Sequence, residues 1–116
     1  MADPRTKLRD LALGFPETHE AFPWDERVVK VRGKVFVFLG RRDGTDEPMI
    51  TVKLVESHGH ALSVEGARPT GYGLGKSGWV TVPVGEVPLA ELRDWVEESY
   101  RIVAPKRLVA TLDGGR

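Results

Sequence analysis

The sequence GYGLGKS at residues 71–77 is the stretch most suggestive of chemistry, because glycine-rich loops that end in Lys-Ser bind phosphates. That pattern requires another Gly five residues before Gly75, and Thr70 occupies the position. The residues after Ser77 predict a strand, so no helix N-terminus is expected to hold a phosphate there. We interpret the segment as a connection across a sheet, in which Lys76 could still contact a nucleic-acid phosphate.

Histidine and acidic residues do not form a pattern typical of a metal or catalytic site. His58 and His60 are two residues apart on a predicted helix, so their side chains point in different directions, and no further ligand stands at a suitable spacing. The last predicted helix carries four carboxylates, which alternate with arginines away from its apolar stripe: Glu91, Asp94, Glu97 and Glu98. We therefore expect no enzyme, no catalytic residue and no metal, and we infer no small-molecule substrate.

Positive charge is concentrated in the middle of a chain whose formal net charge is zero. Residues 1–26 hold three basic and six acidic side chains, whereas residues 27–54 hold seven and three. Such a patch can attract a polyanion even on a neutral protein, although a charge run is also typical of a solvated face with no partner. The candidates for contacts with phosphates are Lys30, Arg32, Lys34, Arg41, Arg42, Lys53 and Lys76.

A hairpin over residues 28–39, VVKVRGKVFVFL, must position the first three of these cations. Its β-branched and aromatic residues indicate two strands, and the turn falls at Arg32-Gly33, where Gly permits the positive φ of a two-residue turn. The pattern then predicts that Val31 pairs with Lys34 and that Val29 pairs with Phe36.

This pairing assigns the apolar residues of the hairpin to two faces. The predicted core face carries Val29, Val31, Phe36 and Phe38. The opposite face carries an apolar strip, which a helix, a second subunit or a partner must cover: Val28, Val35, Val37 and Leu39. The residues after the hairpin, Arg41 to Pro48, predict an exposed loop and a second basic wing.

The remaining elements predict a single α+β domain over residues 1–116, in the order αββββαβα. Helices are expected over about 4–14, 58–65 and 88–103, and further strands over 18–24, 49–54 and 79–84. Ser57 is expected to cap the second helix, and Phe22 is expected to fold onto the first. The longest helix should bury Leu92, Val96 and Val103. We expect the core to span about 4–108 and residues 109–116 to form a flexible tail. The absence of Cys fits a reducing compartment, and no apolar run approaches the ~20 residues of a membrane span, so we expect a cytoplasmic protein.

Several short motifs, taken in order, resemble the MmcQ/YjbR-like family, a small bacterial domain of unknown function. They are Phe22-Pro23-Trp24, the hairpin from Val31 to Phe36, Val52-Lys53-Leu54, Trp79 to Val82 and Ser99-Tyr100, and the resemblance covers about Leu8 to Leu108. It implies an α+β fold with helices on a mostly antiparallel sheet, a proposed double-wing DNA-binding arrangement and no cofactor.

The family pattern also implies roles for individual residues. Lys34 matches the hairpin Lys, Phe36 a buried aromatic and Trp79 the Trp that begins a strand. Trp79 is either a stacking platform for a base or a core residue. Ser99 and Tyr100 match a helical pair that could lock the helix onto the sheet.

Our functional prediction is a sequence-tolerant DNA-binding protein that contacts phosphates through its basic wings. The alternative, from another class, is a non-catalytic protein-interaction module that binds a protein partner or forms a weak homodimer through the apolar strip. An enzyme or a small-molecule site is the third class considered, and a pocket lined by Trp79 and Tyr100 would favour it. We expect no membrane association.

Overall fold

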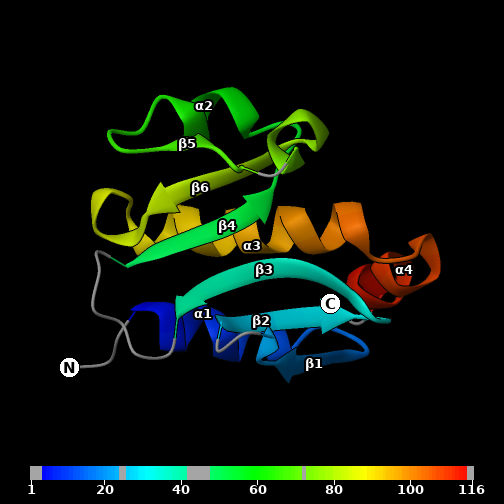
Figure 1. Ribbon diagram of the computed structural model, residues 1–116. Helices are drawn as coiled ribbons and strands as arrows, with labels where there is room; N and C mark the ends of the chain where they lie inside the picture. The colour runs from blue at the N-terminus through cyan, green and yellow to red at the C-terminus, as the bar shows by residue number, and fades with distance from the viewer. Residues whose placement is uncertain (1–3, 24–25, 42–47, 72, 115–116) are drawn as a thin grey trace.

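The computed structural model describes residues 4–23, 26–41, 48–71 and 73–114 (Figure 1). Its strands are β1 (Thr18–Ala21), β2 (Glu26–Val31), β3 (Lys34–Arg41), β4 (Met49–Lys53), β5 (Arg68–Pro69) and β6 (Trp79–Pro83). Its helices are α1 (Pro4–Leu13), α2 (His58–Leu62), α3 (Leu89–Val103) and α4 (Lys106–Gly114), with short 3₁₀ helices η2 (Leu74–Ser77) and η3 (Val84–Glu86).

The described strands form one antiparallel six-stranded sheet in the order β1-β2-β3-β4-β6-β5. Helices α1 and α3 lie behind the sheet in Figure 1, and among the described residues no α-helix lies in front of it. The prediction of an α+β fold with helices on an antiparallel sheet is confirmed. The sheet therefore has a helix-covered face, which holds the core, and a helix-free face.

Helix α3 is the main cover of the core, as its apolar stripe predicts. It begins directly after Pro88, and Leu92 and Val96 are buried while Val103 is partly buried against the core. The Ser99 hydroxyl donates a hydrogen bond to the carbonyl of Phe36, and the Tyr100 hydroxyl donates one of 2.9 Å to the carbonyl of Pro16. These two side chains do join the helix to the strands and to the segment after α1.

The hairpin turn forms as expected, but the pairing beyond it is shifted. Val31 pairs with Lys34, whereas Val29 pairs with Val37 rather than with Phe36, because the register shifts between Val29 and Lys30 as at a β-bulge. One extra residue on β3 exchanges the faces of every residue after it.

The predicted core face was therefore wrong for one residue, and the predicted outer strip was wrong for two. Val37 and Leu39 join the core with Phe36, whereas Phe38 lies on the helix-free face. The apolar side chains that the hairpin leaves on the helix-free face are Val28, Val35 and Phe38. Val28 is nevertheless fully buried there.

The C-terminal segment also differs from its prediction, since residues 106–114 form α4 instead of a tail. Leu108 is buried, and Val109 and Leu112 pack against the core. Arg101 on α3 donates hydrogen bonds of 3.1 and 2.6 Å to the carboxylate of Asp113. The apolar spacing of 108, 109 and 112 was the available signal for this helix.

Three smaller expectations also changed. Helix α2 ends at Leu62, and the Ser57 hydroxyl donates a 2.7 Å hydrogen bond to Glu98 instead of capping α2. Phe22, which we expected to fold onto the first helix, remains 40% exposed. Strand β5 was not predicted, because two residues carry no periodic pattern. None of the described helices has the length and apolar character needed to cross a membrane.

Candidate nucleic-acid interface

Strand pairing places two predicted site lysines on the helix-free face. Lys30 lies opposite Val35 and alternates with Val29 and Val31, which are core residues, so its side chain is on the other face. Lys53 of β4 lies opposite Trp79 of β6.

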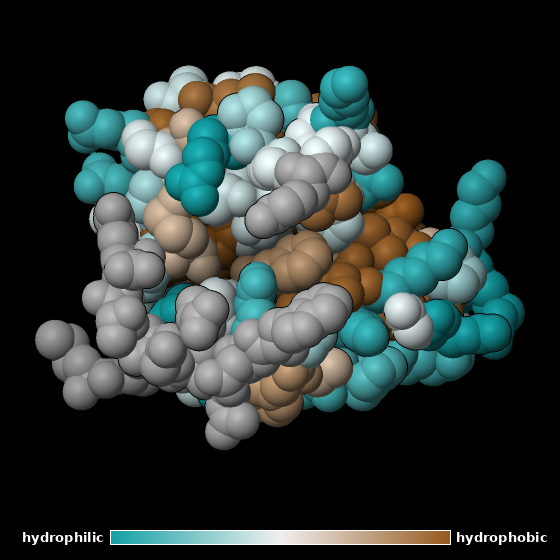
Figure 2. Space-filling model, in the orientation of Figure 1, coloured by the Kyte–Doolittle hydropathy of each residue, from teal (hydrophilic) through white to brown (hydrophobic). Residues whose placement is uncertain are grey.

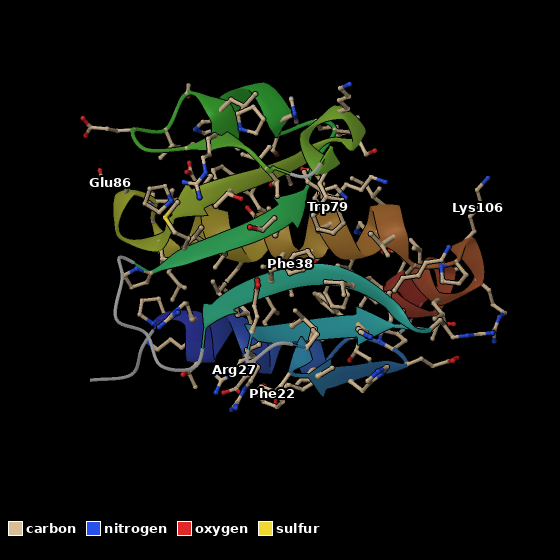
Figure 3. All side chains as sticks on the ribbon, in the orientation of Figure 1. Phe22, Arg27, Phe38, Trp79, Glu86 and Lys106 are labelled. Atoms are coloured by element: carbon tan, nitrogen blue, oxygen red, sulfur yellow. The ribbon has the colours of Figure 1, made fainter. Side chains whose placement is uncertain are left out.

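A second row of side chains runs across the whole helix-free face. The successive cross-strand partners in this row are Ala21, Val28, Phe38, Thr51, Thr81 and Arg68, one from each strand in the order of the sheet. The Phe38 and Trp79 rings meet edge to face in front of the sheet, with centroids 5.5 Å apart (Figure 3). Trp79 is only 8% exposed, so its ring offers little surface for stacking, and the partly exposed Phe38 offers more.

A cleft of about 280 Å³ lies beside Phe38 on this face. Phe38 and Leu74 form apolar parts of its lining, and the charged Glu26 and Arg68 also line it. Its polar lining includes three hydroxyls, which come from Thr51, Thr70 and Thr81. The Oγ1 of Thr81 is 2.8 Å from that of Thr51 and 3.0 Å from that of Thr70, so the three form a hydrogen-bonded chain.

Cations on this side of the molecule have no ion-pair partner among the described residues. They are Lys30, Lys53, Arg68 and Lys76, the last on the 3₁₀ helix that also supplies Leu74 to the cleft. In the space-filling view of this face, apolar side chains gather over its middle with hydrophilic ones around them (Figure 2). Arg68 was missed by sequence reasoning, because a lone basic residue beside a glycine-rich loop gives no signal of its position in a sheet.

The tip of the predicted wing does not join this group. Arg32 has a φ of 51° in the turn, and its guanidinium lies 3.6 Å from the carboxylate of Glu17. Lys34 is exposed but lies opposite Val31, a core residue, so it belongs to the helix-covered side. The side chain of Arg41 and the whole of Arg42 lie outside the described residues. Of the hairpin cations, only Lys30 lies on the helix-free face.

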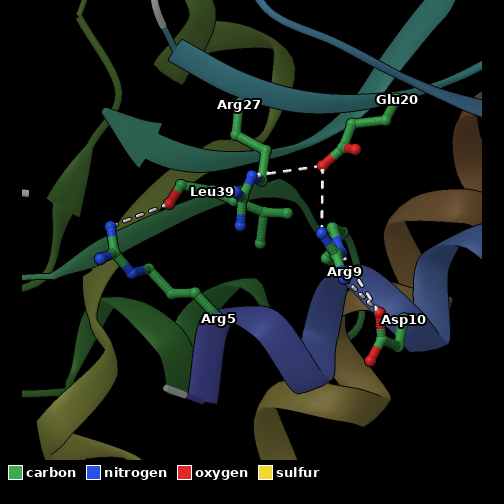
Figure 4. Close-up of polar contacts among 6 residues, drawn as sticks. All are labelled: Arg5, Arg9, Asp10, Glu20, Arg27 and Leu39. Atoms are coloured by element: carbon green, nitrogen blue, oxygen red, sulfur yellow. Dashed lines mark hydrogen bonds and ion pairs between the residues drawn. The ribbon is translucent and has the colours of Figure 1, made fainter. Parts of the chain in front are cut away.

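Arginines on the helix-covered side are instead used to hold α1 on the strands (Figure 4). Glu20 Oε2 lies 3.2 Å from Arg27 Nε and 3.9 Å from Arg9 Nη1, so one carboxylate joins β2 to α1. Arg9 also donates to Asp10, and this hydrogen bond is the main cause of the raised pKa of Arg9. Arg5 donates a 3.2 Å hydrogen bond to the carbonyl of Leu39. These three arginines of α1 and β2 are thus engaged in local contacts.

Among the described residues, the structure does not bring together the side chains expected for a small-molecule pocket, a phosphate-binding loop or a metal site. Trp79 and Tyr100 could have lined a common pocket, but Tyr100 packs in the core and Trp79 lies on the opposite face of the sheet. Residues 74–77, the end of the glycine-rich loop, form η2 and lead into a strand rather than an α-helix. Within the described residues, no three His, Asp or Glu side chains are placed to share a metal ion.

Comparison with known proteins gives a family and a similar structure. The YjbR family model matches residues 13–102. The crystal structure of Deinococcus radiodurans protein DR2400, which has a DUF419 domain, is similar with a TM-score of 0.70 and 26% sequence identity. That similarity covers 89% of this chain and 82% of the other. No curated protein matches the chain.

Proposed function

The chain belongs to the YjbR family, and we propose that its helix-free face binds nucleic acids without sequence preference. Family membership does not by itself identify an activity, so the proposal rests on the surface. The observation that carries the proposal is a group of cations on the same face of the sheet as the partly exposed Phe38 ring. Lys30, Lys53 and Arg68 lie on the helix-free face with no ion-pair partner among the described residues. Arg9 and Arg27, by contrast, share Glu20 on the other side.

Lysine and arginine side chains bind phosphates without reading sequence, and their binding energy comes largely from counterion release. An exposed sheet that presents an aromatic ring between such cations is also a common surface for single strands, whose bases stack on aromatics. Phe38, between Lys30 and Lys53 in the sheet, supplies that ring.

We propose binding rather than catalysis for the cleft beside Phe38. Its three threonine hydroxyls hydrogen-bond to one another, and a nucleophilic hydroxyl would instead need a base within reach. A small set of phosphate contacts and one exposed ring is sufficient for weak, non-specific affinity.

Fluorescence anisotropy of labelled single-stranded and duplex DNA over a salt series tests the proposal. The logarithm of affinity should fall linearly with the logarithm of salt concentration, by about 0.7 per phosphate for single strands and about 0.9 for duplexes. The double variant Lys30→Glu/Lys53→Glu should lose binding. Arg93→Glu/Lys106→Glu makes the same change in charge at two exposed positions on helices and should bind more tightly than the first variant.

Two outcomes would contradict the proposal. One is the absence of binding at low salt to either form of DNA. The other is an equal loss of affinity in both double variants, which would show that net charge alone controls binding. Thermal melts of each variant establish that the protein compared is folded.

Association through the same face is the second candidate function, because Val35 and Phe38 remain partly exposed there. A protein partner or a second copy of this chain could cover these side chains. The buried state of Val28 reduces the apolar area that needs a cover. Measurement of solution mass separates the two candidates: a concentration-dependent dimer that Phe38→Ser abolishes would favour association, and a monomer would favour nucleic acid.

A further inference from the structure

We propose that the cleft beside Phe38 holds one unstacked base of a single-stranded nucleic acid, and that Arg68 binds a phosphate next to that base. This inference rests on the proposed function and specifies the ligand of the same site. It follows from the size of the cleft, its hydroxyls and the charge beside it.

The size of the cleft favours one planar ring system. Its volume of about 280 Å³ lies just below the usual range of roughly 300–1,000 Å³ for ligand pockets. Phe38 and Leu74 contribute apolar surface on which a flat ring can rest. A base within a duplex is stacked on both sides and paired. Only a single strand can place a base in the cleft without the free-energy cost of breaking a base pair.

The hydroxyl chain explains how a base could be held without selection of its identity. The hydroxyls of Thr51, Thr81 and Thr70 have three hydrogens that can be donated. Two of these hydrogens are donated in the two hydrogen bonds between the hydroxyls. One donor and several acceptor lone pairs remain for a ligand, and the hydroxyls can rotate to reverse the direction of the chain. Such a chain can therefore meet either a donor or an acceptor on the edge of a base.

The charged lining of the cleft consists of one acidic residue, Glu26, and one basic residue, Arg68, so a backbone phosphate would have to lie on the Arg68 side. Arg68 lines the cleft, is exposed, and forms no ion pair with any residue that the structure describes. Lys53 lies in the next row of the sheet, beside Trp79 and on the same face. A strand whose base enters the cleft would thus have cations near its successive phosphates.

The test compares three labelled DNA ligands of the same length by anisotropy: a single strand, the same strand with abasic sites throughout, and the duplex. We expect the single strand to bind about tenfold more tightly than the abasic strand, because loss of a stacked base costs about that factor. Phe38→Leu should remove this difference while leaving affinity for the abasic strand unchanged. Phe22→Leu, at an exposed aromatic outside the cleft, should preserve it. Arg68→Gln should weaken binding of both single strands.

Thr51→Val removes one hydroxyl with little change of shape and provides a second cleft variant if Phe38→Leu does not fold. It too should reduce the advantage of the base-bearing strand over the abasic strand. Equal binding of these two strands by the native protein would overturn the base site but leave non-specific binding of the backbone intact. A failure to bind any of the three DNAs would instead refute the proposed function itself. Free mononucleotide that competes as well as the strand would identify a small-molecule site and overturn the proposal.

Discussion

The Ser99 hydroxyl donates a hydrogen bond to the carbonyl oxygen of Phe36, 63 residues earlier in the chain. The Ser99 hydroxyl oxygen in turn accepts a 2.9 Å hydrogen bond from the backbone N–H of Lys53. One buried side chain on α3 thus bridges β3 and β4 beside their ladder, which pairs Val37 with Val52. Through this contact the helix on the covered face helps to position the strand that presents Lys53 on the helix-free face.

Removal of that bridge should destabilise the fold. Ser99→Ala leaves a buried carbonyl and a buried N–H without their partner, which should lower the free energy of unfolding by about 1–3 kcal/mol. Ser63→Ala is the matched control, because the Ser63 hydroxyl also donates to a backbone carbonyl but at an exposed site. Urea unfolding measures both variants, and equal stabilities would contradict the role assigned to Ser99.

Tyr100 should make stability depend on alkaline pH. Its pKa is raised above 10.0, first because burial disfavours the phenolate and second because of the negative charge of Glu17. The folded protein therefore holds this proton more tightly than the unfolded chain does, so the contribution to stability is present below pH 10 and is lost as pH rises through the raised pKa.

Tyr100→Phe tests this dependence. The variant loses the hydrogen bond to Pro16, at a cost of about 1 kcal/mol at neutral pH, and no longer has a phenol to ionise. The difference in unfolding free energy between native protein and variant should shrink as pH rises above the raised pKa. Urea titrations at neutral and alkaline pH measure it, and a difference that stays constant would exclude the proposed linkage.

Helix α3 should not tolerate a charge on its inner face. Val96 has no exposed surface, so Val96→Asp places an unpaired carboxylate in the core and should unfold the domain. Ala90→Asp puts the same side chain on the exposed first turn of the helix, where a negative charge is favourable, and should preserve the fold. Far-ultraviolet circular dichroism distinguishes the two, and a folded Val96→Asp protein would contradict the packing of α3.

The hairpin turn offers a stabilising substitution. Arg32 and Gly33 have φ values of 51° and 83°, as in a type I′ turn, and Asn tolerates the first position better than Arg. Arg32→Asn should raise the free energy of unfolding by up to about 1 kcal/mol, since the exposed ion pair with Glu17 is worth little. Thermal melts should show no such gain for Lys34→Asn, which lies in the adjoining strand; a lower melting temperature for Arg32→Asn would argue against this turn type.

The hairpin tip should contribute less to DNA binding than the lysines on the helix-free face. Arg32→Glu/Lys34→Glu should weaken DNA binding less than Lys30→Glu/Lys53→Glu, because Arg32 is near Glu17 and Lys34 lies on the helix-covered side. Anisotropy at one salt concentration compares the two proteins at equal net charge. A larger loss in the Arg32/Lys34 variant would restore the hairpin tip as the binding wing.

The local elements of this protein were predictable from its sequence. Gly33 indicated the turn, Pro88 and the apolar stripe after it indicated α3, and the mixture of helical and period-two segments indicated an α+β fold. The antiparallel sheet was implied by the family resemblance. These signals are short-range, since turn geometry, helix starts and face alternation depend on residues a few positions apart. The positions of Lys30 and Lys53 on exposed strand faces followed from the same alternation.

Tertiary structure alone decided which side chains share the candidate site. Phe36 packs against Tyr100 with ring centroids 5.2 Å apart and bonds to Ser99, so contacts with α3 accompany the register shift that turns Phe38 to the helix-free face. Pairing of the two-residue strand β5 with β6 brings Arg68 to Thr81 and the cleft. Both outcomes depend on partners far away in the chain, and the residues themselves carry no local pattern that specifies them.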